Sequence, residues 1–271
     1  ILMCGIAGFL TYTDPLNNEL TIRNMLEALI PRGPDGSSWL SIDSDDNLSW
    51  KKLSETYGRE LPLKMAIGCS RLALVDTSDS GLQPIRNSDG NIWAVLNGEI
   101  FNFIELRNEL EGMGFEFKTN TDTETIVHAY EVWGTDCFNH FNGSFAIGIY
   151  DIKNQRLILA RDRIGVRPFF FSIVNQNLYF ASEIKSIITS PEVSRKINLP
   201  VLASIIGLPY KLHWKEGQSL FKDIQEVKPG EKIIFEKQLV PKRELYWKLD
   251  NIEINYNRSF DDYLAQLREL Y

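Results

Sequence analysis

The residue with the clearest chemical potential is Cys4, which begins the apolar run Cys4-Gly5-Ile6-Ala7-Gly8-Phe9 close to the start of the chain. A cysteine in a first strand is usually a buried core residue, and Cys4 alone would favour that interpretation. The alternative is a nucleophile. As the first residue of a mature chain, Cys4 can pass its thiol proton to its own α-amine, whose ordinary pKa is roughly 8. Such a cysteine needs no histidine partner.

Asn97-Gly98-Glu99 follows the predicted strand Ile92–Leu96. An Asn-Gly pair after a strand is most often a hairpin turn, because both residues tolerate positive φ. The functional alternative is an oxyanion hole, in which the Asn97 amide and the Gly98 N–H donate to a developing negative oxygen. Glu99 then adds a carboxylate that can bind an ammonium group.

Two further charged residues suit an amino-acid ligand. Asp122 lies in a Thr-Asp-Thr-Glu capping box at 121–124, and its carboxylate can meet an α-ammonium group. Arg71 precedes an apolar run; an ion pair with Asp76 is the structural interpretation, whereas its fork-shaped guanidinium also suits an α-carboxylate. Together these residues predict an amino-acid pocket, although each has a structural explanation of its own.

The elements that must position these residues are a mixture of strands and helices. Many strand-like runs are apolar on both faces, which is typical of sheets covered on both sides. The order of elements favours an α+β architecture over a doubly wound sheet. The predicted helices are Thr21–Leu29, Phe103–Met113 and Thr123–Trp133. The predicted strands are Gly5–Leu10, Met65–Cys69, Ile92–Leu96, Phe145–Tyr150, Arg156–Ala160, Pro168–Ile173, Leu178–Ala181 and Glu231–Phe235.

Two segments differ from this pattern. The polar stretch Ser41–Glu60 is predicted to be a surface loop or an insertion. At the other end, Phe260–Tyr271 has apolar residues at helical spacing, as if a new helix begins there. A terminal docking helix and the edge of a further domain are equally compatible with that pattern.

Composition narrows the class of protein. The 271 residues are 44% hydrophobic and carry 29 Lys+Arg against 36 Asp+Glu, which gives a net charge of −7. Because no basic block is present, neither nucleic acid nor a membrane is an expected partner, and no apolar run is long enough to span a bilayer. The 3 cysteines and 3 histidines show no metal-ligand spacing, so no metal site and no disulfide framework are predicted. We expect a cytoplasmic globular protein.

Taken together, the motifs resemble those of a known family. The chain resembles the class II glutamine amidotransferase domain, and within it the glutaminase half of asparagine synthetases. The matching runs occur in family order from Cys4 to about Phe235 and are Cys4-Gly5-Ile6-Ala7-Gly8, Arg32-Gly33-Pro34-Asp35-Gly36, Arg71-Leu72-Ala73-Leu74-Val75-Asp76, Gln83-Pro84-Ile85, Asn97-Gly98-Glu99-Ile100-Phe101-Asn102, Thr121-Asp122-Thr123-Glu124, Asn142-Gly143-Ser144-Phe145-Ala146, Ala160-Arg161-Asp162-Arg163 through Arg167-Pro168, and Ala181-Ser182-Glu183-Ile184-Lys185.

The resemblance implies a fold and a reaction. The fold is a four-layer αββα sandwich of N-terminal-nucleophile hydrolase type over residues 4–247, followed by a linker and the start of a C-terminal synthetase domain over residues 248–271. In the reaction, Cys4 attacks the side-chain amide of glutamine, forms a γ-glutamyl thioester and releases ammonia. The implied site residues are Cys4 as nucleophile, Asn97 and Gly98 as the oxyanion hole, and Arg71, Glu99, Asn102, Asp122 and Arg32 around the glutamine.

The resemblance also implies partners outside this chain. ATP and Mg are expected only in the synthetase domain, so this chain needs no cofactor, and its own sequence has no Ser-Gly-Gly-x-Asp-Ser pyrophosphate loop. We expect the ammonia to serve ATP-dependent amidation of aspartate. A sugar acid or a peptide carboxylate as acceptor, a non-catalytic scaffold and a homodimer all stay open.

Three features depart from the family pattern. Pro31 stands where the family usually has His, and Cys69-Ser70 replaces a His-Arg pair before Arg71. Ser41–Glu60 is longer than expected, which slightly favours an acceptor other than aspartate. Ile1-Leu2-Met3 precede Cys4, and an amide nitrogen on Cys4 cannot act as a base. The chain as written is therefore expected to hydrolyse glutamine poorly until these three residues are removed.

Overall fold

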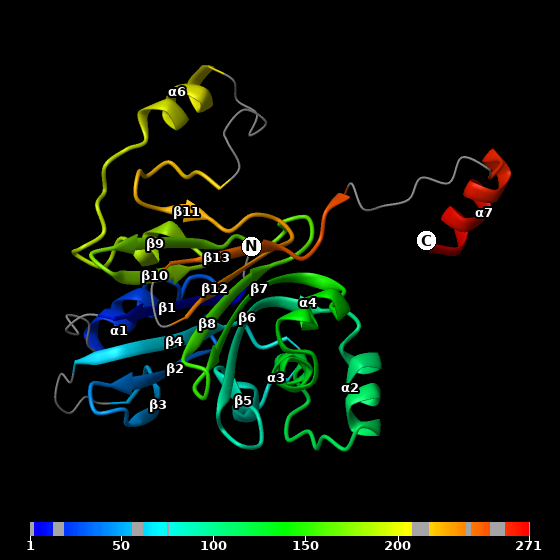
Figure 1. The fold of residues 1–271 in the computed structure, drawn as a ribbon, viewed down its shortest axis with the longest axis horizontal. Helices are drawn as coiled ribbons and strands as arrows, with labels where there is room; N and C mark the ends of the chain where they lie inside the picture. Colours follow the sequence, from blue (N-terminus) through cyan, green and yellow to red (C-terminus); the bar gives the residue numbers. More distant parts are fainter. Residues whose placement is uncertain are drawn as a thin grey trace.

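The computed structural model describes residues 3–12, 19–55, 62–74, 76–207, 217–236, 240–249 and 258–270. Two β-sheets lie face to face, and helices cover their outer faces (Figure 1). Every strand pair within the two sheets is antiparallel. This arrangement is the four-layer αββα sandwich predicted from the sequence.

The seven-stranded sheet places the start of the chain at its centre. Its order is β11-β9-β10-β1-β4-β2-β3. All residues of β1 are buried, because β10 and β4 flank it and apolar layers cover both faces. Cys4 therefore lies directly before a strand that is fixed on every side. The strands are β1 (Gly5–Thr11), β2 (Gly36–Asp43), β3 (Leu48–Lys52), β4 (Leu63–Arg71), β9 (Phe170–Val174), β10 (Asn177–Ala181) and β11 (Gln225–Glu226).

The six-stranded sheet carries the Asn97-Gly98-Glu99 motif. Its order is β13-β12-β8-β7-β6-β5. The motif is not a hairpin turn but part of β6, where Gly98 pairs with Phe145 of β7. The strands are β5 (Ile85–Arg86), β6 (Ile92–Ile100), β7 (Gly143–Asp151), β8 (Arg156–Arg161), β12 (Glu231–Phe235) and β13 (Lys242–Leu245).

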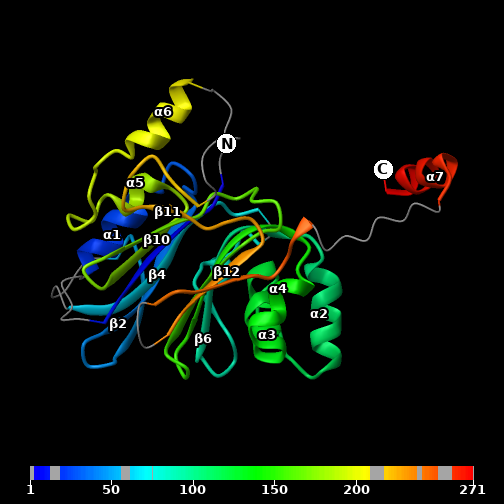
Figure 2. The same ribbon diagram turned by 45° about the horizontal axis from the view of Figure 1, so that its top comes forward.

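Helices form the two outer layers (Figure 2). On the seven-stranded sheet these are α1 (Glu19–Glu27) and α5 (Ile184–Ile187), and on the six-stranded sheet α2 (Phe103–Gly112), α3 (Asp122–Trp133) and α4 (Cys137–His140). Two short 3-10 turns, η1 (Asp79–Gly81) and η2 (Gly134–Asp136), and helix α6 (Leu199–Gly207) complete this body. Helix α7 (Phe260–Leu270) lies apart from both sheets in both views, and its Phe260, Tyr263 and Leu267 are exposed. The predicted C-terminal helix is thus confirmed.

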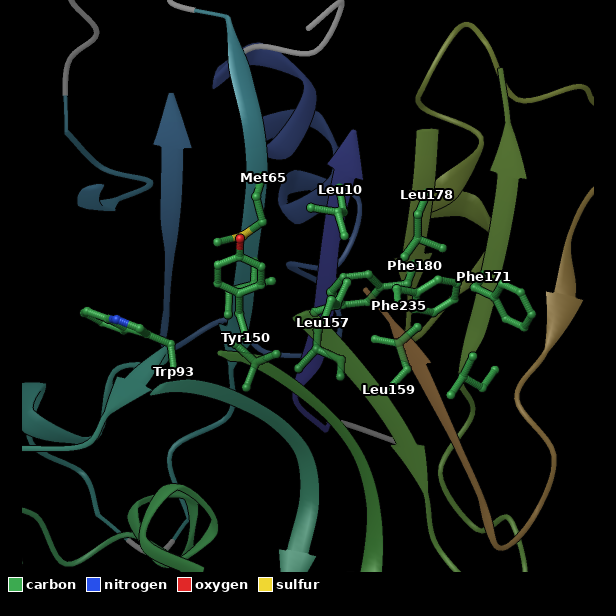
Figure 3. Packing of buried hydrophobic residues seen from close by; sticks show 14 of the residues in the cluster. Leu10, Met65, Trp93, Tyr150, Leu157, Leu159, Phe171, Leu178, Phe180 and Phe235 are labelled. Carbon is green, nitrogen blue, oxygen red and sulfur yellow. The ribbon is translucent and has the colours of Figure 1, made fainter. Parts of the chain in front are cut away.

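The core consists of three apolar clusters, one between each pair of layers. Figure 3 shows the cluster between the sheets, where Leu10 and Met65 of one sheet meet Tyr150 and Leu157 of the other. Alternation along β1 explains two of these clusters, since Ile6 and Leu10 point to the opposite sheet while Ala7 and Phe9 point to α1. The sequence pattern of strands apolar on both faces is confirmed.

The prediction of a surface loop at Ser41–Glu60 is wrong. Residues 41–43 end β2, and β3 returns alongside it as an edge hairpin; residues 56–61 lie outside the described chain. The Asp43 carboxylate forms the turn by accepting the N–H groups of Asp45 and Asn47, each at 2.9 Å. Polarity misled the prediction because β3 is a half-exposed edge strand, and only its pairing with β2 identifies it. The other predicted strands and helices are confirmed within a few residues.

Among the described residues, no helix combines the length and the apolar character needed to cross a membrane.

Candidate active site

A pocket opens where the two sheets meet at the start of β1. The seven-stranded sheet supplies Cys4 and the end of β4, and the six-stranded sheet supplies the end of β6 and the first turn of α3. Five of the eight predicted site residues lie on its wall. The lining residues are Met3, Cys4, Arg71, Leu72, Leu74, Asp76, Gly81, Gln83, Gly98, Glu99, Thr121, Asp122, Thr123 and Arg167.

Cys4 presents a thiol prepared for ionisation. The backbone N–H of Leu72 lies 3.3 Å from its Sγ. The neighbouring Cys69 thiol lowers the pKa of Cys4 to about 7; burial opposes this shift, and the Leu72 N–H and the Arg71 charge support it. The Cys4 thiol and complete burial raise the pKa of Cys69. Of the two thiols, Cys4 is the one that can lose its proton near neutral pH.

Arg71 ends β4 with a buried guanidinium beneath the loop 76–82. Its Nη1 donates to the carbonyl of Ser78 at 2.8 Å, so the predicted ion pair with Asp76 is not what holds it. Asp76 instead accepts from the N–H and the hydroxyl of Ser78 at 2.9 and 2.6 Å, which shapes the loop. A Cβ at Gly81 would lie 2.2 Å from Nη2 of Arg71. The guanidinium therefore fits against a residue with no side chain.

The end of β6 departs from regular strand geometry at Gly98. Its φ is +137°, and a Cβ there would lie 2.0 Å from the carbonyl oxygen of Ser144, so only glycine fits. The Asn97 side chain is buried behind the pocket wall, and neither of its amide atoms has a hydrogen-bond partner in the described part of the chain. A buried donor without a partner is costly, and Asn97 itself does not line the pocket. Glu99 lies on the wall beside Gly98.

Asp122 is held at the N-terminus of α3. Thr121 caps this helix by accepting the N–H of Glu124 at 3.3 Å, as the capping-box pattern predicts. The Asp122 carboxylate accepts the N–H of Ile100 at 3.0 Å and so joins α3 to β6. Burial outweighs this bond and, with the nearby Glu99 charge, raises the pKa of Asp122 to about 6. A cationic group in the pocket would offset that cost.

Arg32 and Asn102 lie outside the pocket wall. Arg32 donates from Nε to the carbonyl of Cys4 at 3.0 Å and from Nη1 to Glu183 at 2.8 Å, so it fixes the backbone that carries the thiol. Asn102 precedes α2 and accepts the N–H of Asn142 at 2.9 Å while donating to the carbonyl of His140 at 3.0 Å. These contacts support the site from behind.

Comparisons with known proteins agree with this geometry. A family model described as a glutamine amidotransferase domain matches residues 3–247. The chain belongs to the glutamine amidotransferase domain family. It is 34% identical to the glutamine-hydrolyzing asparagine synthetase 3 of Bacillus subtilis, over 99% of this chain and 40% of that protein. It is 30% identical to a putative glutamine-hydrolyzing asparagine synthetase 2 of Methanocaldococcus jannaschii, over 95% of this chain and 49% of that protein.

Solved structures support the fold of this amidotransferase domain. The allosteric regulatory enzyme of purine biosynthesis superposes with a TM-score of 0.66 at 22% identity, over 94% of this chain and 50% of that chain. The glutamine phosphoribosylpyrophosphate amidotransferase of Bacillus subtilis gives 0.65 at 22% identity, over 90% of this chain and 49% of that chain. This amidotransferase domain thus spans about half, or less, of the length of each of these proteins.

The structure adds three residues to this amidotransferase site that sequence reasoning did not select. Cys69 lies behind Cys4, as described above. Gln83 bridges the sheets, since its carbonyl accepts the Ser38 hydroxyl and its Oε1 accepts the N–H of Leu96, both at 2.6 Å. Arg167 reaches the pocket wall from the loop after β8.

The loop that carries Arg167 is fixed by a fully buried carboxylate. Asp162 accepts the backbone N–H groups of Phe145, Val166 and Arg167 at 3.2, 2.9 and 3.0 Å. Burial lowers the pKa of Arg167, although Glu99 and Asp162 oppose this. Arg167 and Gln83 each belong to a family motif, yet only the fold brings them to the pocket.

Proposed function

We propose that this domain hydrolyses the side-chain amide of glutamine to glutamate and ammonia. The observation that carries the proposal is the convergence of a thiol with a lowered pKa, an arginine and two carboxylates on one pocket. Membership of the amidotransferase family supports the same reaction. A scaffold without catalysis has no need for a buried carboxylate with a raised pKa, such as Asp122, beside a nucleophile, because its ionised form destabilises the fold.

The pocket charges match the charges of a bound amino acid. Arg71 uses Nη1 for Ser78, which leaves its other N–H groups for the α-carboxylate of glutamine. Asp122 and Glu99 face the α-ammonium group, which favours the ionised form of Asp122. Held by both groups of its α-carbon, the ligand directs its side-chain amide toward Cys4.

The covalent step uses atoms of Cys4 itself. As the thiol proton passes to the Cys4 α-amine, Sγ adds to the amide carbon, and the electron pair of the C=O bond moves to oxygen, where Gly98 N–H and the Asn97 amide can donate to it. Collapse breaks the C–N bond, and the nitrogen leaves as ammonia with a proton from the Cys4 α-amine. Water then hydrolyses the γ-glutamyl thioester to glutamate and restores the thiol.

The first experiment is covalent trapping with 6-diazo-5-oxonorleucine. We compare protein that starts at Cys4 with protein that retains Met3, and use Cys4→Ser as the variant without the thiol. The expected result is one adduct at Cys4 and ammonia release only in the first protein. Ammonia release by Cys4→Ser would contradict Cys4 as the nucleophile, and an unmodified Cys4 in the processed protein would favour the scaffold.

For the whole protein, we propose that the ammonia feeds ATP-dependent amidation in the cytoplasm, with aspartate as the acceptor. Residues 248–271 would then lead into a C-terminal synthetase domain that binds ATP and Mg. The names of two relatives, both asparagine synthetases, support aspartate. The argument for another acceptor from a long polar insertion loses weight, because residues 41–43 and 48–52 of that stretch are strand residues of the sheet. Glutamine-dependent formation of asparagine from aspartate and ATP by the full-length protein tests this proposal.

A further inference from the structure

The N–H of Gly98 lies on the edge of β6 that faces away from β7. Gly98 lies opposite Phe145 in the ladder. Phe145 uses both of its backbone groups for Asp162, because its N–H donates to Oδ2 at 3.2 Å and its carbonyl accepts the Asp162 N–H at 2.9 Å. Gly98 and Phe145 therefore form a non-hydrogen-bonded pair, whose N–H groups point outward. Among the described strands, only β5 pairs with this outer edge, at Trp93 and Ala94.

The neighbouring N–H groups on this edge already have acceptors. Alternate residues of a strand direct their N–H groups to the same side, so those of Leu96 and Ile100 flank that of Gly98. The Leu96 N–H donates to Oε1 of Gln83 at 2.6 Å. The Ile100 N–H donates to the Asp122 carboxylate at 3.0 Å. Gln83 and Asp122 thus stand on either side of the Gly98 N–H, and all three residues line the pocket.

The side-chain amide of Gln83 is fixed in one orientation. Because a backbone N–H can only donate, the Gln83 atom bonded to Leu96 is the oxygen, and the NH2 group takes the other position. The Gln83 backbone is fixed as well, since its carbonyl accepts the Ser38 hydroxyl at 2.6 Å. Nε2 donates to no acceptor in the described part of the chain, and protein atoms do not enclose it. The NH2 group therefore faces the pocket that Gln83 lines.

We propose that Gln83 is a further catalytic residue of the glutaminase reaction. As Sγ of Cys4 adds to the amide carbon, Nε2 of Gln83 donates, beside the Gly98 N–H, to the oxygen that gains negative charge. Gln83 transfers no proton and forms no covalent bond. The proposal rests on the proposed function and adds a donor to it that stands on the pocket wall, where the Asn97 side chain does not.

Two variants separate this donation from mere support of β6. Gln83→Glu keeps an oxygen for the Leu96 N–H but has no N–H to donate, whereas Gln83→Met loses both. In protein that starts at Cys4, both variants should lower kcat for ammonia release by about 10²-fold, with KM for glutamine within a factor of three. Near wild-type kcat in Gln83→Glu would overturn the proposal. If Gln83→Met alone were impaired, Gln83 would only hold the strand.

The matched control is Gln266→Glu on α7, which lies apart from both sheets. The Oε1 of Gln266 also accepts a hydrogen bond, from Arg258 at 2.8 Å, and its Nε2 likewise has no acceptor among the described residues. The control therefore makes the same chemical change and adds the same charge away from the pocket. Its kcat and KM should equal those of wild type.

A second measurement needs no hydrolysis of glutamine. The probe is the chloromethyl ketone analogue of glutamine, in which CH2Cl replaces the amide nitrogen. Sγ of Cys4 bonds to its methylene carbon and chloride leaves, while the ketone oxygen gains negative charge. Iodoacetamide alkylates the same thiolate without the pocket donors. The ratio of the two rates, followed by intact mass, therefore cancels any change in the ionised fraction of Cys4.

Both Gln83 variants should lower this ratio by about 10-fold relative to wild type. An unchanged ratio, or a wild type that does not react with the chloromethyl ketone, would overturn the role of Gln83. A lowered ratio in a protein whose wild type releases no ammonia from glutamine would support Gln83 as a donor and refute the proposed function. The two failures are thus distinguishable, because alkylation needs no glutamine.

Discussion

The seven-stranded and the six-stranded sheet bring different chemistry to the pocket between them. The first contributes the thiol and the cation, Cys4 and Arg71, from regular strand ends. The second contributes Gly98 and Asp122, from a distorted strand and a helix N-terminus that carry buried polar groups at a cost. The thiol and the guanidinium thus lie at the ends of regular strands, whereas Gly98 and Asp122, proposed for the oxyanion and the α-ammonium group, require local irregularity.

A second contrast lies within the first turn of α3. Asp122 and Glu124 are both buried, and burial raises the pKa of both. For Glu124, the nearby His128 and hydrogen bonds from the N–H groups of Lys118 and Thr119 outweigh burial, so its pKa is lowered. For Asp122, burial outweighs the backbone hydrogen bonds, so its pKa is raised. Glu124 is thus bound within the fold, whereas Asp122 is the carboxylate that we propose for the ligand.

The largest effect on catalysis is expected from Gly98→Ala, which disturbs the end of β6 at the pocket. A Cβ would lie 2.0 Å from the carbonyl oxygen of Ser144, so the strand and its N–H must move. We expect kcat for ammonia release to fall by about 10²–10³-fold. Gly112→Ala is the control, because nothing lies within 4 Å of its Cβ. Near wild-type kcat in Gly98→Ala would contradict an oxyanion role.

Asp122→Asn should lower kcat/KM by about 10²-fold, because the α-ammonium loses a charged partner. It should also stabilise the protein at pH 7.5. The folded-state pKa of about 6 exceeds the ordinary 3.8, so an unfavourable contribution grows as pH rises through this range. We expect a gain of about 1 kcal/mol, or roughly 2–4 °C in Tm, that vanishes at pH 4. A variant less stable than wild type at pH 7.5 contradicts this account.

Gly81→Ala tests Arg71, the cation that the seven-stranded sheet contributes to the pocket. Its Cβ would lie 2.2 Å from Nη2 of Arg71, the mobile end of a long side chain, so the guanidinium moves rather than the backbone. We expect KM for glutamine to rise by about 10-fold with kcat within a factor of three. Steady-state kinetics measures both values. An unchanged KM would show that the α-carboxylate of glutamine does not bind to Arg71.

His128→Gln should leave kcat and KM unchanged and affect only stability. Burial opposes the charged imidazole, but Glu124 and Glu131 outweigh it and raise the pKa of His128. Its stabilising contribution is therefore complete below the ordinary pKa of 6.5 and is lost as pH rises through the raised value. Urea unfolding at pH 6 should show a loss of about 1–2 kcal/mol that shrinks by pH 9. A loss of unfolding free energy that grows with pH would contradict a stabilising role for the charged His128 side chain.

Local patterns predicted much of the fold because they report local physics. Thr121 caps α3 as the capping box indicates, although Glu124 turns to the N–H groups at 118–119 instead of back to Thr121. The buried strands were found from their apolar runs. The hairpin of β2 and β3 was missed because its polar residues resemble a loop until they pair.

The functional site, like the fold, could be predicted only in part from local sequence patterns. Cys4, Arg71, Gly98, Glu99 and Asp122 were selected by residue type and motif, and all five line the pocket. Asn102 was selected too, but its amide joins α2 to the segment 140–142. The sequence gives no sign of which way a polar side chain turns, because that depends on partners 40 residues away along the chain.

By itself, the sequence determined which residue types are present, which segments are strands or helices, and the family to which the chain belongs. Only the tertiary structure decided which groups meet: Cys69 with Cys4 across β1 and β4, Gln83 between the sheets, and Arg167 at the pocket. The physical reason is that propensity and periodicity act over a few residues, whereas pKa shifts and binding geometry arise from contacts set by strand register and sheet packing.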